Sequence, residues 1–280
     1  MNLVYQAYGI EDILEQTLFS IVSLMFHTKP ESSLQAIIYT DQPEWFQKFF
    51  NDSSFVKIIA IDQAQIQKWR GEIDFVHRVK IEVLKDAGQK FEGPIFYCDG
   101  DTYFHKDPTP LFEKVDDQTS LMHIKEAELG TQKNPLTKKV YKFVKNNTFT
   151  VSGTTVEMNH QTEMWNAGVI GVSKKNKKFF KDILELTDQM HAKYPKHVME
   201  QLAVSYVLQK QTRLLSAEKE IYHYWDQKPE YQLKIQRFFG DYTNINTALK
   251  AYSQFEFPVP LQPKVSVLKQ AMHKLFSSRP

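Results

Sequence analysis

A chain of 280 residues is long enough for one large α/β domain or two small ones, and 42% hydrophobic residues can fill a sizeable core. The formal net charge of +2 argues against a general nucleic-acid binder, which normally carries a strong basic excess. The single cysteine, Cys98, excludes an internal disulfide and fits a small buried side chain in a reducing compartment. No secretory signal or bilayer-spanning run is visible, so we expect a cytoplasmic protein.

The first part of the chain alternates short apolar runs with segments of helical periodicity. The runs are rich in β-branched and aromatic residues, as is typical of strands. In the last of the helical segments, Gly88 stands where a helix commonly ends. This alternation predicts an α/β fold with a mostly parallel sheet flanked by helices on both faces. The predicted strands are residues 3–8, 36–39, 56–61 and 95–98, and the predicted helices are residues 10–25, 43–50 and 74–87.

The second part of the chain has a weaker pattern. Residues 125–161 are polar and charged, with one predicted helix after Pro135, which is typical of an insertion or a mobile loop. Loops of this kind often carry specificity, and a solvated basic helix is an equally good interpretation. We interpret residues 165–172 as one strand containing two glycines. The other predicted elements are a helix start at 107–110, a strand at 120–124 and helices at 176–193 and 198–208.

The predicted strand at residues 95–98 ends abruptly in two carboxylates, Asp99 and Asp101, on either side of Gly100. In open α/β sheets ligands bind beyond the carboxyl ends of the strands. Gly100 would let the backbone turn tightly, so that both carboxylates face one point. Two hard oxygen ligands suit a divalent cation. Taken alone, the same residues also fit a solvated Asp-Gly turn that closes a hairpin.

Several short motifs follow one another in a distinctive order over residues 1–240. The motifs are Tyr8-Gly9, Tyr39-Thr40-Asp41, Arg78 and Lys80, Asp99-Gly100-Asp101, Trp165-Asn166-Ala167-Gly168, Glu200-Gln201, His223 and Lys228-Pro229. Each is weak alone, and the acidic strand end combined with the downstream Asn-Ala-Gly is the most specific part. Their order resembles the GT-A nucleotide-sugar glycosyltransferases, and most nearly the family 8 group that includes glycogenin and bacterial lipooligosaccharide galactosyltransferases.

The resemblance implies a Rossmann-like GT-A fold and transfer of a hexose from a nucleotide-diphosphate sugar, with a UDP-sugar as the expected donor and retention at the anomeric carbon. Breaking a sugar-diphosphate bond leaves negative charge on the leaving oxygens, which a divalent metal and cationic side chains stabilise. The resemblance implies His223 as a third metal ligand beside Asp99 and Asp101, and Asp99 would also contact the donor. Mixed oxygen and imidazole ligation suits Mn²⁺, with Mg²⁺ as an alternative.

The resemblance also implies residues that bind the donor. Arg78 and Lys80 precede the acidic strand, where the family has a phosphate-contacting lysine, and Lys80 fits this place better. Lys228 would contact the phosphates, although its spacing from His223 is shorter than in the family. Tyr8 would stack on a uracil-type base, and Asp41 would lie near the base or ribose. The alternative interpretations are a solvated helix face for Arg78 and Lys80, a core tyrosine for Tyr8 and a helix or turn cap for Asp41.

Residues 166–168 are expected to contact the sugar. Ala167 and Gly168 remove side-chain bulk where a sugar must approach the backbone, and Asn166 could bond sugar hydroxyls. The resemblance implies Gln201 near the reacting carbon and Glu200 near donor or acceptor hydroxyls. Asn166, Glu200 and Gln201 are therefore the candidate catalytic residues. A core strand containing glycine would explain Gly168 but gives no reason for the polar Asn166.

The expected organisation is one GT-A domain over residues 1–256, with residues 125–161 as an insertion or acceptor loop, and a tail at residues 257–280. The tail has no acidic residue, and residues 264–280 combine basic side chains with one apolar helical face. Such a tail could lie on an anionic membrane surface, which would place the protein at the inner face of the membrane. It could equally pack on the domain with its basic side in water.

Two other functions fit a chain of this kind. A sugar nucleotidyltransferase uses a related sheet and metal carboxylates, but it usually has a glycine-rich basic loop after the first strand, whereas residues 8–12 read Tyr-Gly-Ile-Glu-Asp. A non-catalytic sugar-nucleotide-binding relative would be expected to have lost metal ligands, and Asp99, Asp101 and His223 are all present. The expected partners are a nucleotide-sugar donor and a glycan or lipid-linked acceptor, and no nucleic acid.

Overall fold

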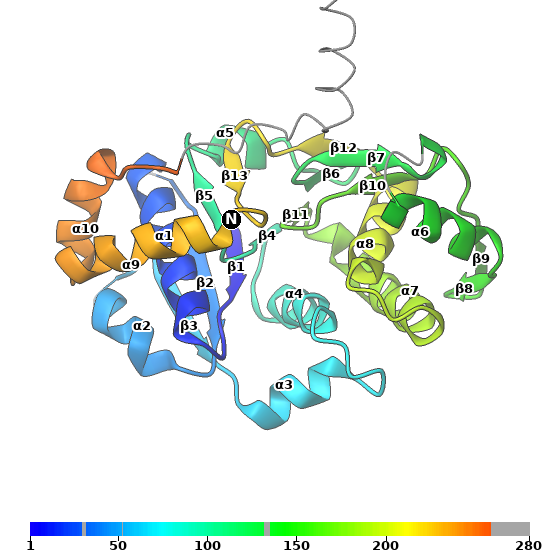
Figure 1. Ribbon diagram of the computed structural model, residues 1–280, viewed down its shortest axis with the longest axis horizontal. Coiled ribbons are helices and arrows are strands. Elements are labelled where there is room, and N and C mark those ends of the chain that lie inside the picture. Colours follow the sequence, from blue (N-terminus) through cyan, green and yellow to red (C-terminus); the bar gives the residue numbers. More distant parts are fainter. Residues whose placement is uncertain (30–31, 52, 132–134, 259–280) are drawn as a thin grey trace, which may run out of the picture.

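A seven-stranded sheet forms the centre of the molecule (Figure 1). The computed structural model describes residues 1–29, 32–51, 53–131 and 135–258, so the membrane prediction for residues 264–280 lies outside the described residues. All strands of this sheet run parallel to one another except β11. The strands, in spatial order, are β12 (Arg213–Ser216), β6 (Thr119–Met122), β11 (Val169–Val172), β4 (Ile95–Cys98), β1 (Asn2–Gln6), β2 (Gln35–Thr40) and β3 (Val56–Ala60).

The central strands are buried on both faces, and successive side chains point to opposite cores. In β1, Leu3 and Tyr5 face one core whereas Val4 faces the other. In β4, Phe96 and Cys98 share the core of Leu3. The prediction of Cys98 as a small buried side chain is therefore confirmed, because it has no exposed surface and no disulfide.

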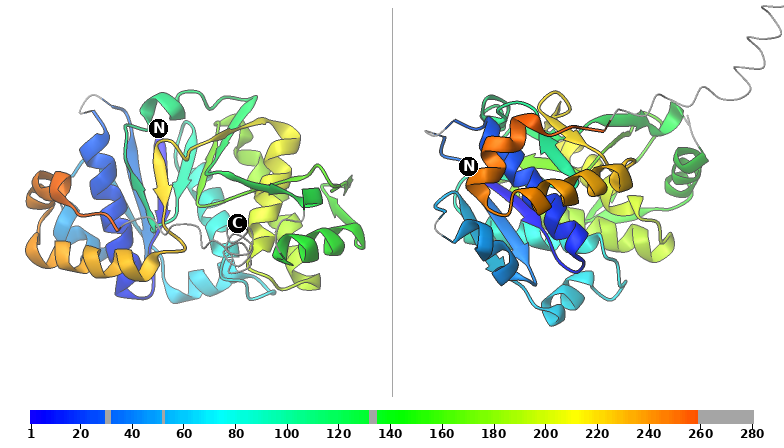
Figure 2. Two further views of the ribbon diagram at one scale, coloured as in Figure 1. Left: turned by 45° about the horizontal axis from the view of Figure 1, so that its top comes forward. Right: turned by 60° about the vertical axis from the view of Figure 1, so that its left-hand side comes forward.

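Helices cover both faces of the sheet, as the alternation of strands and helices predicts (Figure 2). One core contains residues of α3 (Gln63–Arg70), α4 (Arg78–Lys90), α6 (Pro135–Lys145), α7 (Phe179–Lys193) and α8 (Val198–Gln211). The other contains residues of α1 (Glu11–His27), α2 (Pro43–Phe50), α5 (Thr109–Phe112), α9 (Lys228–Asp241) and α10 (Ile245–Ala251). Within the described residues, no helix has the length and apolarity required to cross a membrane.

The predicted strand at residues 165–172 is wrong, because this segment belongs to two sheets. Glu163–Trp165 forms β10, which pairs with β7 (Lys125–Glu128), and β11 begins only at Val169. The sequence conceals the break, since both pieces are apolar and buried. Because β11 is antiparallel to its neighbours, it begins at the edge where the parallel strands end. The link between β10 and β11 therefore lies beside the acidic end of β4.

The free edge of β10 is occupied by side chains of α8. Ser205 Oγ accepts a hydrogen bond from the Trp165 amide at 2.9 Å, and Gln209 bonds both the amide and the carbonyl of Glu163 at 2.8 Å. Exposed strand edges invite pairing with other chains, and these side chains satisfy the backbone groups instead. They also fix α8, which carries Glu200 and Gln201, against the ribbon of β7 and β10.

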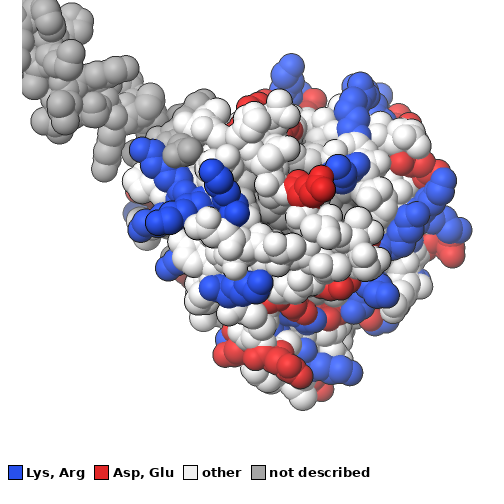
Figure 3. All heavy atoms as spheres, turned by 90° about the vertical axis from the view of Figure 1, so that its right-hand side faces the viewer, with Lys and Arg blue, Asp and Glu red and all other residues white. Residues whose placement is uncertain are grey.

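Residues 125–161 form ordered elements over their described part. After β7 come the 3₁₀ turn η1 (Leu129–Thr131), α6 and the hairpin of β8 (Phe149–Val151) and β9 (Thr154–Val156). The predicted helix after Pro135 is confirmed: Val140 and Val144 pack inward, and the lysines of α6 are exposed. On the side of the molecule that carries these elements, basic and acidic side chains are intermixed (Figure 3).

Two boundaries before β4 differ from the predicted ones. The helix predicted at residues 74–87 is α4, which begins at Arg78, because Asp74 lies in a turn with φ of 46°. It runs past Gly88 to Lys90, since the Lys177 ammonium donates to the Gly88 carbonyl at 3.1 Å and to the Phe91 carbonyl at 2.6 Å. A cation at the last turn thus replaces the predicted glycine cap. Helix α3 was not predicted.

The remaining elements bring the chain back to the acidic strand end. The short strands β5 (Thr102–Phe104) and β13 (Ile221–His223) pair antiparallel, with His223 opposite Thr102. The 3₁₀ turn η2 (Lys175–Lys178) precedes α7, and the 3₁₀ turn η3 (Tyr252–Gln254) follows α10. The β5–β13 pairing joins parts of the chain that are more than a hundred residues apart. Among the described residues, β5 is the only strand that pairs with β13.

Candidate active site

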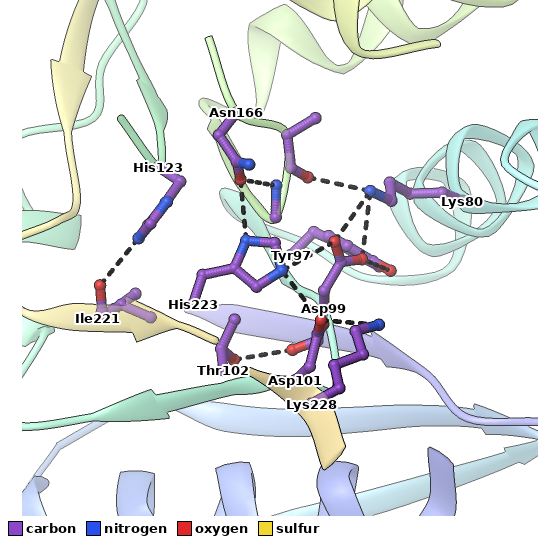
Figure 4. A network of polar contacts seen from close by, with 12 residues as sticks. Lys80, Tyr97, Asp99, Asp101, Thr102, His123, Asn166, Ile221, His223 and Lys228 are labelled. Carbon is purple, nitrogen blue, oxygen red and sulfur yellow. Dashed lines mark hydrogen bonds and ion pairs between the residues drawn. The ribbon is translucent and has the colours of Figure 1, made fainter. Parts of the chain in front are cut away.

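The carboxyl end of β4 holds two carboxylates in different surroundings (Figure 4). Asp99 accepts a hydrogen bond from the buried Tyr97 hydroxyl at 2.7 Å, and its backbone amide donates to the Gly168 carbonyl at 2.8 Å. Asp101 is 5% exposed and lies 2.8 Å from the Lys228 ammonium through Oδ2. Burial opposes ionisation of Asp101, but His223 and Lys228 outweigh it and hold its pKa well below the usual range.

Gly100 is required by space rather than by a special backbone turn. Residues 100 and 101 form the expected turn, but the φ of Gly100 is not in the left-handed region, so the turn by itself does not require glycine. A Cβ at this position would lie 2.6 Å from the Thr17 hydroxyl of α1. Helix α1 therefore packs directly on the backbone between the two carboxylates, and only glycine permits this approach.

His223 reaches the carboxylates through the pairing of β13 with β5. Its Nε2 lies 3.2 Å from Asp101 Oδ1 and 3.9 Å from Asp99 Oδ2. The ring is buried and lies edge-on to the ring of His123, with centroids 5.5 Å apart. The His123 Nε2 lies 3.1 Å from the Ile221 carbonyl, two residues before His223, so His123 also fixes the strand that carries the histidine.

Asn166 determines which nitrogen of His223 carries the proton. The Gly168 amide donates to Asn166 Oδ1 at 2.9 Å, so the atom at this position must be the oxygen. The same oxygen lies 2.9 Å from His223 Nδ1, which must therefore donate. In the neutral ring, Nε2 then presents a lone pair to the two carboxylates.

These donor atoms fit a divalent cation. Ligand atoms of Asp99, Asp101 and His223 all lie within 4.8 Å of one another. Three lone-pair-bearing atoms that converge on one point repel each other unless a cation, or a proton on Nε2, lies between them. Two carboxylate oxygens and one imidazole nitrogen, with the proton of the imidazole held on its other nitrogen, are a ligand set for ions such as Mn²⁺.

Lys80 and Glu200 complete a buried charged cluster behind Asp99. The Lys80 ammonium lies 3.2 Å from Asp99 Oδ1, 3.1 Å from the Ala167 carbonyl and 3.6 Å from Glu200 Oε1. Burial alone would lower the pKa of Lys80, but Asp99 and Glu200 outweigh it and raise that pKa above its ordinary value. Burial raises the pKa of Glu200 to about 7, against the opposing effect of Lys80. One ammonium thus serves two carboxylates, and it lies closer to Asp99 than to Glu200.

We expect the Glu200→Gln substitution to stabilise the metal-free protein increasingly as pH rises from about 4.5 to about 7. In this range the folded wild type keeps a proton on Glu200 that the unfolded chain releases, so wild-type stability falls as pH rises. Glutamine has no such proton, and the difference between the two proteins should shift by about 2–3 kcal/mol across the range. Urea unfolding in EDTA at several pH values measures it, and a pH-independent difference would contradict the assignment.

Arg78 does not join this cluster. Its guanidinium forms a two-point contact with Asp188 of α7, at 2.7 and 3.1 Å, and bonds Glu82 at 2.9 Å. A further N–H donates to the Trp69 carbonyl at 2.8 Å. Arg78 thus joins α3, α4 and α7. Lys80, two residues further along α4, faces the acidic strand end instead.

We expect Arg78→Lys to lower the free energy of unfolding by about 2–4 kcal/mol, because lysine cannot reproduce a planar contact with three partners at a site that is 13% exposed. The matched control is Arg70→Lys, whose pairing with Asp74 is more exposed and should be worth less than about 1 kcal/mol. Urea unfolding of both variants tests the difference, and equal losses would contradict it.

Tyr8 and Asp41 lie at the carboxyl ends of β1 and β2. Tyr8 is half-buried, and burial raises its pKa to about 12. Both Asp41 carboxylate oxygens lie near the Gly9 amide, at 3.2 and 3.3 Å, and one accepts from Gln63 at 2.9 Å. Asp41 therefore fixes the loop that follows Tyr8, as the turn-cap interpretation predicts. A role of either side chain in binding a base is left as a prediction.

Position 168 requires glycine for a structural reason that the sequence did not reveal. A Cβ here would lie 2.3 Å from His223 Nδ1 and 2.9 Å from Asn166 Oδ1. The glycine thus makes room for the histidine ring, whether or not a sugar also approaches. Lys228, at the start of α9, is half exposed and contacts Asp101, so its ammonium lies at the cluster.

Sequence reasoning missed three residues that the fold brings to the cluster. Glu126 of β7 accepts from Asn166 Nδ2 at 3.1 Å and from Gln201 Nε2 at 2.9 Å. His123 packs on His223, and His77, at the start of α4, has its pKa lowered to about 4 by burial and then by Lys80. None belongs to a recognisable motif, and Glu126 lies in the weakly patterned residues 125–161. A fourth missed residue, Tyr97, could have been found, because side chains two residues apart on a strand lie on the same face and Tyr97 is two residues before Asp99.

Comparison with solved structures identifies the fold. The chain is similar to galactosyltransferase LgtC in complex with donor and acceptor sugar analogues, at 13% identity and TM-score 0.52, over 78% of this chain and 74% of that one. An active-site mutant of LgtC gives 14% identity, a TM-score of 0.51 and coverage of 78% and 73%. Mouse xyloside xylosyltransferase 1 in its apo form gives 13% identity, a TM-score of 0.50 and coverage of 77% and 85%.

Comparison with protein-family models gives no match, and comparison with curated proteins gives none either. The chain nevertheless has the GT-A fold, that of the nucleotide-sugar glycosyltransferases, with its mostly parallel central sheet. LgtC and a xylosyltransferase are among the structures it resembles, and the resemblance predicted from the order of the motifs is confirmed for the fold.

Proposed function

We propose that the protein is a metal-dependent glycosyltransferase that moves a hexose from a nucleotide-diphosphate sugar, with UDP as the nucleotide. The observation that carries the proposal is the convergence of Asp99, Asp101 and His223, with His223 Nδ1 held by Asn166 Oδ1, beside the ammonium groups of Lys80 and Lys228. The similarity to a galactosyltransferase solved with donor and acceptor sugar analogues gives independent support.

Each group in the cluster has a task that follows from its chemistry. A bound Mn²⁺, or Mg²⁺ in its place, would be held by Asp99, Asp101 and His223 and would supply positive charge to the leaving diphosphate. Lys228, which is half exposed, can turn toward the phosphates. Lys80 is buried, and its ion pair with Asp99 holds that carboxylate in place. These are the electrostatic requirements of a reaction that builds negative charge on the leaving group.

On the sugar side, the proposal uses Asn166, Gln201 and Glu200. Gln201 is half-buried at the start of α8 and would lie near the reacting carbon, whereas Glu200 is 3% exposed and near Lys80. Gly168, Tyr8 and the loop fixed by Asp41 would form the rest of the donor site. Retention at the anomeric carbon is part of the proposal and rests on the family resemblance.

The acceptor in this proposal is a glycan or a lipid-linked glycan, reached from the side of residues 125–161. Association of the basic residues 264–280 with an anionic membrane surface, and with it a place on the cytoplasmic face, remains a prediction from composition. The sugar nucleotidyltransferase alternative is less favoured, because the segment after β1 is not a glycine-rich basic loop. Its single glycine, Gly9, is followed by Ile10, Glu11 and Asp12.

The test is hydrolysis or transfer by the full-length protein across a panel of UDP-, GDP- and CDP-sugars, with Mn²⁺, with Mg²⁺ and with EDTA. We expect release of UDP from one or a few UDP-sugars that depends on the metal. Thermal-shift measurements on the same panel should show stabilisation by the accepted donor only with metal present. Release of pyrophosphate from a nucleoside triphosphate and a sugar phosphate would favour the nucleotidyltransferase instead. Absence of both binding and turnover would favour a non-catalytic relative.

A further inference from the structure

The side chain of Glu126 joins two amides that have separate tasks in the proposed site. Glu126 Oε1 accepts from Asn166 Nδ2 at 3.1 Å, and Oε2 accepts from Gln201 Nε2 at 2.9 Å. Glu126 lies on β7, is exposed, and forms no ion pair within the described residues. Its position is therefore held by these two hydrogen bonds rather than by burial.

The first hydrogen bond reaches the metal ligands through Asn166. Asn166 has no freedom to exchange its oxygen and nitrogen, because the Gly168 amide requires an oxygen and Glu126 requires a donor. With both ends of the carboxamide held, Oδ1 stays 2.9 Å from His223 Nδ1. Glu126 thereby contributes to holding the His223 proton on Nδ1 and Nε2 toward Asp99 and Asp101.

The second hydrogen bond fixes the amide of Gln201. Since Gln201 Nε2 donates to the carboxylate, the carbonyl oxygen of this side chain is directed away from Glu126. A half-buried glutamine would otherwise sample more than one rotamer, and the bond removes that freedom. The residue proposed near the reacting carbon and the imidazole proposed to bind the metal are thus positioned by the same carboxylate.

We propose that Glu126 is a positioning residue that couples the orientation of His223, through Asn166, to that of Gln201. The inference rests on the proposed metal site. A carboxylate suits this task because it only accepts hydrogen bonds and has one oxygen for each amide. Glutamine at this position would present a donor to one of the two amides, and aspartate, shorter by one methylene, would not span both.

The test is Mn²⁺ affinity of the full-length protein, measured without nucleotide by the electron paramagnetic resonance signal of free Mn²⁺. We expect Glu126→Gln to weaken binding by about tenfold. The matched control, Glu128→Gln, removes the same charge from the same strand, where Glu128 pairs with Lys125, and should change binding only slightly. Glu126→Asp should resemble Glu126→Gln, which separates positioning from charge and provides a second variant if the first fails to fold.

A double-mutant cycle identifies the path of the effect. Because Glu126 acts on the metal site through Asn166, Glu126→Gln should add no further loss of Mn²⁺ affinity in an Asn166→Leu background. Nitrogen NMR of the His223 ring in the metal-free protein, at alkaline pH, should show the proton on Nδ1 in the wild type and a mixture of tautomers in Glu126→Gln.

The outcomes separate this inference from the proposed function. If the wild-type protein does not bind Mn²⁺, the proposed metal site is wrong, and this inference is wrong with it. Wild type that binds Mn²⁺ while Glu126→Gln binds equally well, or losses that simply add in the double mutant, would overturn the positioning role alone.

Discussion

Replacing Asp101 with asparagine is expected to reduce metal-dependent hydrolysis of the accepted UDP-sugar by a factor of about 10²–10³. Asp101 is one of two carboxylates at the proposed cation and the one that faces both His223 and Lys228. Asparagine keeps the shape but removes the charge, so the metal loses a ligand and Lys228 loses its ion-pair partner. Steady-state assays over a range of Mn²⁺ concentrations measure the effect and show whether added metal restores any rate.

A charge-removing control separates this effect from a general loss of stability. Asp182→Asn on α7 removes a carboxylate that accepts from the Ser152 hydroxyl, far along the chain from the cluster. It should leave the rate within a few-fold of wild type. Circular dichroism should show that both variants fold. Equal activity of Asp101→Asn and wild type at limiting Mn²⁺ would exclude a metal-binding role for this residue.

Gly168→Ala is expected to weaken Mn²⁺ binding by at least about tenfold and to lower the free energy of unfolding by about 1–3 kcal/mol. The added Cβ would lie 2.3 Å from His223 Nδ1 and 2.4 Å from Cε1, so the ring has to move. Moving it breaks the hydrogen bond to Asn166 that holds the proton on Nδ1. The methyl group adds no charge, so a loss of metal affinity would come from displacement of the ring.

The control for this substitution is Gly240→Ala in α9. A Cβ at position 240 would meet no atom within 4 Å. Alanine inside a helix should then stabilise the protein by about 0.5–1 kcal/mol and leave Mn²⁺ binding unchanged. Isothermal titration with Mn²⁺ and urea unfolding compare the two variants. Unchanged metal affinity in Gly168→Ala would contradict the placement of His223 against this glycine.

Much of the sheet could be predicted from local pattern. Strands β1, β2, β3 and β4 are short apolar runs between helical segments, and their side chains alternate between two cores. The segment from β10 to β11 could not be predicted, because two buried apolar pieces look like one strand until their partners are known. Helix α4 was misplaced for a similar reason, since the ammonium of Lys177 from another part of the chain holds its last turn.

The sequence by itself determined the order of motifs and the acidic end of β4 with Asp99 and Asp101, because residue type and strand periodicity are local properties, whereas His223 was implied by the family resemblance. Only the tertiary structure decided how these residues meet. The antiparallel direction of β11 and the pairing of β13 with β5 bring Asn166 and His223 to the carboxylates. The hydrogen bond that the Gly168 amide donates to Asn166 and the one that Asn166 donates to Glu126 then set the orientation of Asn166. Contacts of this kind depend on distance in space, which the spacing of residues along a chain does not contain.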